Sequence, residues 1–286
     1  MSTQRFTPLS DGASIGVFAP GAPARADRVE AGCAALTSLG YQPKLCGDPS
    51  AFYGNYEYLF SNGSAAERAD QCQQLFADDG IAGILAARGA YGCFEILPLL
   101  DYDLIQKKAK PLVGYSDVTA LLIALQARSG VMAIHGPTLS KEWAEWSESE
   151  DARQSVASLE RLWRGTMRPG EAFFAAKSLR KGEVAGPLLV ANLTVLVSLL
   201  GTHFQPDFEG RILVVEDIGE APFRIHRSLL QLFAAGAFRN LAGLIFGRFD
   251  RCDAKNGPSV DEVIRAFQSS YLAGTTFPIL IDAPVG

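Results

Sequence analysis

The stretch Pro111-Leu112-Val113-Gly114-Tyr115-Ser116-Asp117-Val118-Thr119-Ala120 decides how the middle of this chain folds. Its apolar start predicts a buried strand, and the residues that follow it, Leu121-Leu122-Ile123-Ala124-Leu125, predict a helix. A lone serine, Ser116, therefore stands on the turn between strand and helix. A serine on such a turn exposes its hydroxyl, and the first amides of the helix point toward any oxyanion formed beside it. The pattern is typical of a nucleophile, which needs a base to activate it.

Strands and helices alternate on both sides of this turn. Before it we expect strands at residues 14–20, 40–45 and 83–87, with helices at 27–39 and 64–78, the second capped by Ser64. After residue 180 we expect strands at 184–188, 211–215, 242–246 and 278–281, with helices at 193–200 and 225–234. This alternation predicts an α/β fold: an N-terminal parallel sheet with helices on both faces that carries the serine turn, and a smaller C-terminal α/β domain. Ligands of such sheets bind at the carboxyl ends of the strands, where residues 19–20, 88–92 and Ser116 would lie.

The composition excludes several classes of protein. The chain has 286 residues, of which 48% are hydrophobic and 20% charged, as in ordinary globular proteins. A net charge of -5 with dispersed basic residues argues against nucleic acid as a partner. No leader sequence or membrane span is evident, so we expect a cytoplasmic protein with no membrane partner. The 5 cysteines form no C-x-x-C pair, which disfavours a disulfide framework and a zinc cluster, and we expect no metal ion or cofactor.

The pattern changes between about Ser140 and Lys181, where acidic and small residues gather. We therefore expect a nucleophile domain at 1–140, a connecting segment at 141–180 and a C-terminal domain at 181–286. The acidic run contains Trp143 and Trp146. It is interpreted either as a solvated helix or as a lid whose tryptophans contact a ligand.

Glu216 follows a predicted buried strand and is the second candidate site residue. It could be a cap or surface acid, or it could orient a histidine that takes the proton of Ser116. Each of the 3 histidines, His135, His203 and His226, is a candidate for that base, and none has a persuasive spacing. The residues by themselves predict a serine and an acid without a base.

Several motifs together resemble those of the LD-carboxypeptidase family of serine peptidases, which includes muramoyltetrapeptide carboxypeptidases and microcin C7 self-immunity proteins. The resemblance runs nearly end to end and rests on these stretches: Val17-Phe18-Ala19-Pro20, Ala87-Arg88-Gly89-Ala90-Tyr91-Gly92, Gly114-Tyr115-Ser116-Asp117-Val118-Thr119-Ala120-Leu121, His135-Gly136-Pro137, Asn192-Leu193-Thr194, Gly201-Thr202 and Glu216-Asp217-Ile218-Gly219-Glu220-Ala221-Pro222-Phe223-Arg224-Ile225.

The resemblance implies a serine, glutamate and histidine triad. Ser116 and Glu216 match the first two members. The family's histidine follows a C-terminal Pro-x-Gly, and Pro284-Val285-Gly286 matches that motif. The third member is therefore not among these 286 residues, and we expect the histidine directly after Gly286; the alternative is a polypeptide that has lost this base.

The resemblance also implies a substrate and a binding site. It implies hydrolysis of the amide between the L-centre of meso-diaminopimelate and a terminal D-alanine, in peptidoglycan recycling by a homodimer. An oxyanion hole is expected from the region of Gly89 and Ala90 with Asp117. Arg88 and Tyr91 are interpreted either as substrate-binding residues or as residues that hold this loop.

Four positions depart from the family pattern: Ala90 replaces a glycine, Val190-Ala191 replaces Gly-Gly, and His226 replaces an aspartate. The change at Val190-Ala191 could narrow the pocket. Two other functions remain open. One is a microcin-type immunity hydrolase that cleaves a peptidyl or aminoacyl group from a nucleotide analogue, which tryptophans facing the cleft would favour. The other is a protein that binds a peptidoglycan fragment without cleaving it.

Overall fold

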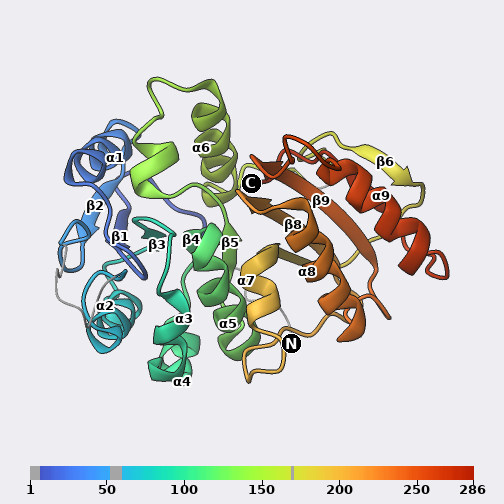
Figure 1. Cartoon of the computed structure of the whole chain (residues 1–286). Coiled ribbons are helices and arrows are strands. Elements are labelled where there is room, and N and C mark those ends of the chain that lie inside the picture. The colour runs from blue at the N-terminus through green and yellow to red at the C-terminus, as the bar shows by residue number, and fades with distance from the viewer. Residues whose placement is uncertain (1–6, 52–59, 169–170) are drawn as a thin grey trace. The chain divides into compact units, whose positions relative to one another are not determined.

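The computed structural model describes residues 7–51, 60–168 and 171–286 and divides the chain into two compact units, Met1–Glu171 and Ala172–Gly286 (Figure 1). Residues 1–6, where a leader would begin, and residues 169–170 of the expected connecting segment lie outside the described part. Each unit is built on its own five-stranded sheet.

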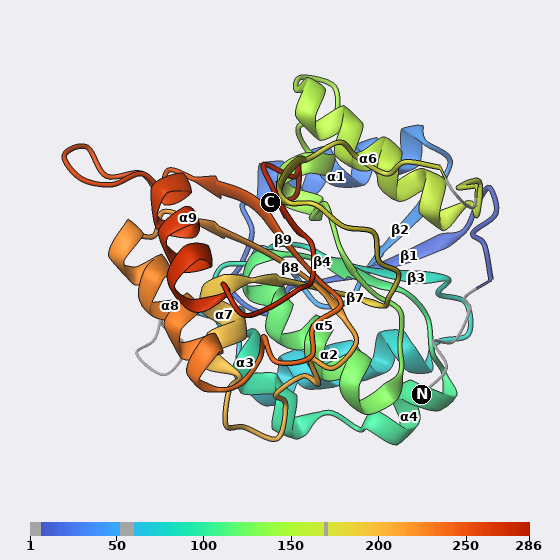
Figure 2. The ribbon, with the colours of Figure 1, turned by 90° about the vertical axis from the view of Figure 1, so that its right-hand side faces the viewer.

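The sheet of the first unit is parallel in every pairing, with the strand order β2-β1-β3-β4-β5. Its strands are β1 (Ser14–Phe18), β2 (Gln42–Leu45), β3 (Gly83–Ala86), β4 (Leu112–Gly114) and β5 (Ala133–His135). The helices are α1 (Ala26–Ser38), α2 (Ala65–Ala77), α3 (Cys93–Ile96), α4 (Tyr102–Lys107), α5 (Thr119–Ser129) and α6 (Glu150–Trp163). Helices α1 and α6 cover one face of the sheet, and α2, α4 and α5 cover the other (Figure 2).

Short non-α turns complete the first unit: the 3-10 turns η2 (Leu97–Leu99) and η3 (Ser116–Val118) and the π-helix η4 (Leu139–Trp143). The helix expected from Ser64 onward is α2, and Ser64 and Glu67 form a reciprocal capping box at its start. The backbone amides of Ser64 and Glu67 thus each have an acceptor at the start of the helix, which explains why α2 begins where the sequence indicates.

Most of the segment expected to connect two domains packs into the first unit. Trp143 of η4 and Trp163 of α6 are fully buried, and their rings stack with centroids 6.0 Å apart. Trp146 packs partly buried against the same core. The buried positions of α6, Ala152, Val156, Leu159 and Trp163, recur at helical spacing. Neither alternative for this acidic run describes Trp143, because its side chain is part of the core.

The sheet of the second unit has the order β6-β10-β9-β8-β7, in which only β6 pairs antiparallel among the described strands. The strands are β6 (Lys177–Arg180), β7 (Leu188–Asn192), β8 (Ile212–Ile218), β9 (Gly243–Asp250) and β10 (Ile279–Ile281). The helices are α7 (Leu193–Ser198), α8 (Pro222–Ala234) and α9 (Val260–Tyr271). The predicted α/β fold with two sheet domains is confirmed.

Two strands of the second unit differ from the prediction. The strand expected at 184–188 begins only at Leu188, because Pro187 has no amide to donate to a ladder. β8 continues past Val215 to Ile218, so Glu216 lies within a strand and not after it. In the part of the chain that the structure describes, no helix combines the length and the apolar character that a membrane crossing requires.

Candidate active site

Ser116 lies on a sharp turn between β4 and α5, as the sequence predicts. Tyr115 is extended, Ser116 has a φ of 61°, and the 3-10 turn η3 leads directly into α5. A left-handed backbone costs a residue with a Cβ about 1–2 kcal/mol. The fold of the first unit therefore holds a serine in a strained conformation, which is common at functional sites.

The loop after β3 lies against this serine. A Cβ built on Gly89 would stand 2.9 Å from the Cβ and 3.3 Å from the Oγ of Ser116, and 3.0 Å from the carbonyl oxygen of Tyr115. Only a glycine lets the backbone approach the serine so closely. The structure thus brings together Ser116 and Gly89, which the sequence placed at two separate strand ends.

Asp117 joins the serine turn to the start of α3, which directly follows the loop that ends at Gly92. Its Oδ2 accepts a hydrogen bond of 2.8 Å from the backbone amide of Cys93, the first residue of α3. Burial raises the pKa of the Asp117 carboxyl, and hydrogen bonds from Cys93 offset part of this rise. The side chain of Asp117 therefore fixes the loop, while any contribution to an oxyanion hole would come from its backbone.

Arg68 of α2 is a buried cation that the sequence did not single out. Its side chain is fully buried; its Nη1 donates to the carbonyl oxygens of Pro20 and Gly92 at 2.5 and 2.8 Å, and its Nη2 pairs with Glu95. One guanidinium thus holds the loop after β1 and the loop after β3 together. Only the contacts between distant segments reveal this role, because an arginine in an amphipathic helix is ordinarily a surface residue.

The remaining candidates of this loop are exposed. Arg88 donates from Nη1 to the carbonyl oxygen of Pro23 at 3.0 Å, so it holds the loop after β1. Ala90 has a φ of 73°, a conformation that the glycine of the family pattern adopts without strain. Tyr91 is 57% exposed, and its ring meets that of Phe60 edge to face at 5.6 Å. Both Arg88 and Tyr91 remain accessible to a ligand.

The second unit buries the predicted acid. Glu216 is only 3% exposed and lies opposite Asn192 of β7, at a register shift between β8 and β9. Its neighbour Asp217 accepts hydrogen bonds from Asn192 Nδ2 at 3.1 Å and from the Thr194 hydroxyl at 2.7 Å. Because Glu216 is buried within a strand, it is neither a cap nor a surface acid. The hydrogen bonds of Asp217 connect β8 to the start of α7.

The end of the described chain packs against Glu216. The amide of Arg248 donates to the carbonyl oxygen of Val285 at 2.7 Å, which fixes this segment beside β9. A Cβ built on Gly286 would stand 2.8 Å from the Cβ and 3.0 Å from the Oε2 of Glu216. Gly286 therefore holds its backbone next to the carboxylate.

The three histidines lie in different surroundings. His135 ends β5 opposite Gly114, its ring is 5.9 Å from that of Tyr115, and burial lowers its pKa to about 4. His226 packs edge to face between Phe267 and Tyr271 of α9, which gives it a structural role between helices. His203 is exposed on the loop after α7.

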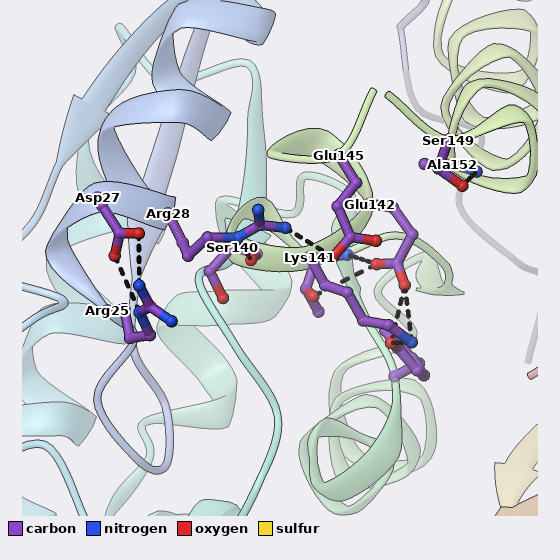
Figure 3. Close-up of polar contacts among 11 residues, drawn as sticks. Arg25, Asp27, Arg28, Ser140, Lys141, Glu142, Glu145, Ser149 and Ala152 are labelled. Atoms are coloured by element: carbon purple, nitrogen blue, oxygen red, sulfur yellow. Dashed lines mark hydrogen bonds and ion pairs between the residues drawn. The ribbon is translucent and has the colours of Figure 1, made fainter. Parts of the chain in front are cut away.

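Glu142 and Lys141 of η4 reach the serine turn through Tyr115. The Tyr115 hydroxyl donates to Glu142 Oε1 at 2.8 Å and accepts from Lys141 Nζ at 2.9 Å. Figure 3 shows the side chains of Lys141 and Glu142 extending from η4 toward one another. In the sequence Glu142 belongs to the acidic run, which is interpreted as a solvated helix or a lid. Nothing local to Lys141 or Glu142 marks Tyr115 as a tertiary partner.

This chain is similar in sequence to two carboxypeptidases and in fold to a solved structure. The chain is 33% identical over 246 residues to the probable murein peptide carboxypeptidase of Bacillus subtilis, covering 85% of this chain and 74% of the relative. It is 31% identical to the murein tetrapeptide carboxypeptidase of Pseudomonas aeruginosa, covering 100% of this chain and 91% of the relative. The solved structure of microcin C7 self-immunity protein MccF superimposes with a TM-score of 0.83 at 23% identity, covering 98% and 91% of the two chains, and shows a shared fold.

Family assignment follows from the two domains. The LD-carboxypeptidase N-terminal domain matches residues 15–136, which include the serine turn, and the LD-carboxypeptidase C-terminal domain matches residues 185–286, which include Glu216. This chain therefore belongs to the LD-carboxypeptidase family of peptidases.

Proposed function

We propose that this protein is a serine carboxypeptidase that removes the terminal D-alanine from murein tetrapeptide in cytoplasmic peptidoglycan recycling. The observation that carries the proposal is the geometry of Ser116, a strained serine at a strand-to-helix turn with the Gly89 backbone against its side chain. The names of the relatives from Bacillus subtilis and Pseudomonas aeruginosa support the substrate class. As the family resemblance implies, the active protein is a homodimer.

In this proposal Ser116 is the nucleophile. Its Oγ attacks the carbonyl carbon of the amide to D-alanine while its proton passes to the histidine expected directly after Gly286. Backbone amides of the Gly89 and Ala90 loop and of Asp117 stabilise the oxyanion, and the histidine then protonates the leaving amine. Water hydrolyses the acyl-enzyme in the second half of the reaction. No metal ion or cofactor takes part.

Glu216 is the orienting acid in this proposal. The support is local to the second unit: Glu216 is buried, and Gly286 lies against its side chain, so a residue that follows Gly286 begins beside the carboxylate. A buried carboxylate in this place fixes the tautomer of an imidazole and stabilises its protonated form.

Release of free D-alanine from murein tetrapeptide by the full-length protein tests the proposal. Ser116→Ala is expected to abolish release, and Glu216→Gln to lower kcat by about three to four orders of magnitude, as for loss of a triad acid. Ser198→Ala and Glu209→Gln make the same changes at exposed positions and should leave kcat unaltered. Release by Ser116→Ala at the wild-type rate would contradict the proposal, and tight binding without release by the wild type would instead support a binding protein.

A further inference from the structure

The π-helix η4 touches both parts of the serine site in the first unit. Its Ser140 amide donates to the carbonyl oxygen of Ala87 at 2.9 Å. Ala87 directly follows β3 and begins the loop that carries Gly89. The two residues after Ser140, Lys141 and Glu142, hold the hydroxyl of Tyr115, the residue directly before Ser116. A wide helical turn of this kind is rare and is frequently found at functional sites.

The contact to Tyr115 is made by a charged pair in which Glu142 is partly buried and Lys141 is exposed. The Glu142 side chain is 14% exposed, and its Oε1 lies 3.4 Å from Lys141 Nζ. Its second oxygen, Oε2, accepts from the backbone amide of Thr138 at 3.0 Å, which fixes the carboxylate relative to the start of η4. Lys141 Nζ also lies 5.5 Å from the centroid of the Tyr115 ring. Charge-assisted hydrogen bonds are shorter and stronger than neutral ones, so this pair restrains the tyrosine on both sides of its hydroxyl.

Packing of the same turn gives the restraint a rigid base. Leu139 and Trp143, at the two ends of η4, are fully buried in the core of the first unit. A Cβ built on Gly32 of α1 would stand 2.7 Å from Leu139 Cγ, so η4 packs closely against that helix. The polar contacts to Tyr115 and Ala87 therefore start from a part of the molecule that cannot shift easily.

We propose that Glu142 and Lys141 are positioning residues, which hold the Ser116 turn in register with the Gly89 loop through the hydroxyl of Tyr115. This inference rests on the proposed function of Ser116. A nucleophile on a left-handed residue needs such support, because its strain favours relaxation of the turn. Both hydrogen bonds are made by the Tyr115 hydroxyl. A phenylalanine at position 115 would keep the ring in place but would lose these two hydrogen bonds.

The test compares Tyr115→Phe, Glu142→Gln and Lys141→Met with the wild type in two measurements. The first is kcat and KM for release of D-alanine from murein tetrapeptide. The second is hydrogen exchange of the amides of residues 114–118, which needs no substrate. Glu145→Gln is the matched control, because it removes a carboxylate from the same segment that pairs with Arg28 of α1 (Figure 3).

We expect Tyr115→Phe and Glu142→Gln to lower kcat about tenfold with little change in KM, as for a small misplacement of the nucleophile. Exchange at residues 114–118 should become faster in both. Lys141→Met should show a smaller loss of kcat that Lys141→Arg restores, since arginine keeps a donor, and Glu145→Gln should match the wild type. Unchanged exchange and kcat in Tyr115→Phe and Glu142→Gln would overturn the inference, as would an equal loss in Glu145→Gln. If the wild type itself releases no D-alanine, the proposed function fails, and exchange at 114–118 still decides the positioning role.

Discussion

Gly89→Ala tests the close approach between the loop after β3 and the nucleophile turn. The new Cβ would stand 2.9 Å from the Cβ of Ser116 and 3.0 Å from the carbonyl oxygen of Tyr115. Carbon atoms in ordinary contact are about 3.5–4.0 Å apart, so the loop or the turn must move by roughly 0.6–1 Å. Neither neighbour is the end of a flexible side chain, and the turn is already strained at Ser116.

The expected effect on activity follows from this displacement. A misplacement of about 1 Å at a catalytic centre can lower the rate by about 100-fold. Overpacking costs about 1–3 kcal/mol of stability, and the lower entropy of the unfolded alanine chain offsets about 0.4–1 kcal/mol of this. We therefore expect kcat for D-alanine release to fall by about two orders of magnitude, with a net loss of about 1–2 kcal/mol in urea unfolding.

Gly83→Ala is the matched control, because Gly83 is the first residue of β3, the strand that leads into the loop of Gly89. A Cβ on Gly83 would meet its nearest neighbours, Leu9, Pro111 and Ile15, at 3.6–3.7 Å, which is ordinary contact. We expect wild-type kcat and unchanged or slightly higher stability for this variant. If Gly89→Ala and Gly83→Ala behave alike in both assays, the argument for a close approach is refuted.

Three further variants test other parts of the first unit. Ala90→Gly should raise the free energy of unfolding by up to about 1 kcal/mol, because glycine relieves the φ of 73° at that position; urea unfolding measures it, and a loss of stability would contradict the reasoning. Arg68→Met should destabilise the protein by about 3 kcal/mol, since it leaves the carbonyl oxygens of Pro20 and Gly92 without their buried donor; a melting temperature equal to that of the wild type would speak against this role. His135→Asn should make the free energy of unfolding less sensitive to acid. Burial lowers the pKa of His135 to about 4, whereas the unfolded chain takes up its proton near 6.5, so wild-type stability should fall by up to about 3 kcal/mol as the pH drops through this window. Identical pH profiles of wild type and variant in urea unfolding would exclude this contribution.

The sequence predicts best those elements whose signals are local. The strand and helix on either side of Ser116 are marked by an apolar run and a helical pattern, and both form as β4 and α5. Ser64 marks the start of α2 in the same way. Helix α6 was not predicted as a separate element, although its buried residues recur at helical spacing, because the acidic run just before it guided the interpretation of the whole segment.

The site was predictable only in part, for the same physical reason. Ser116 and Glu216 each stand at or near the carboxyl end of a buried strand, which is a local signal. The roles of Arg68 and Glu142 depend on partners 24 or more residues away, such as Gly92 and Tyr115. No periodicity in a single sequence records such contacts, and both residues read as ordinary charged surface positions.

The central claim is that the Oγ of Ser116 forms the acyl-enzyme, and mass spectrometry of the protein quenched during turnover tests it most directly. Murein tetrapeptide is mixed with the full-length protein, the reaction is stopped in acid, and the proteolytic peptides are analysed. The account predicts an adduct of the substrate's acyl group, without D-alanine, on the peptide that contains Ser116, and its absence in Ser116→Ala. An adduct on another residue, or turnover that persists in Ser116→Ala, would contradict the account.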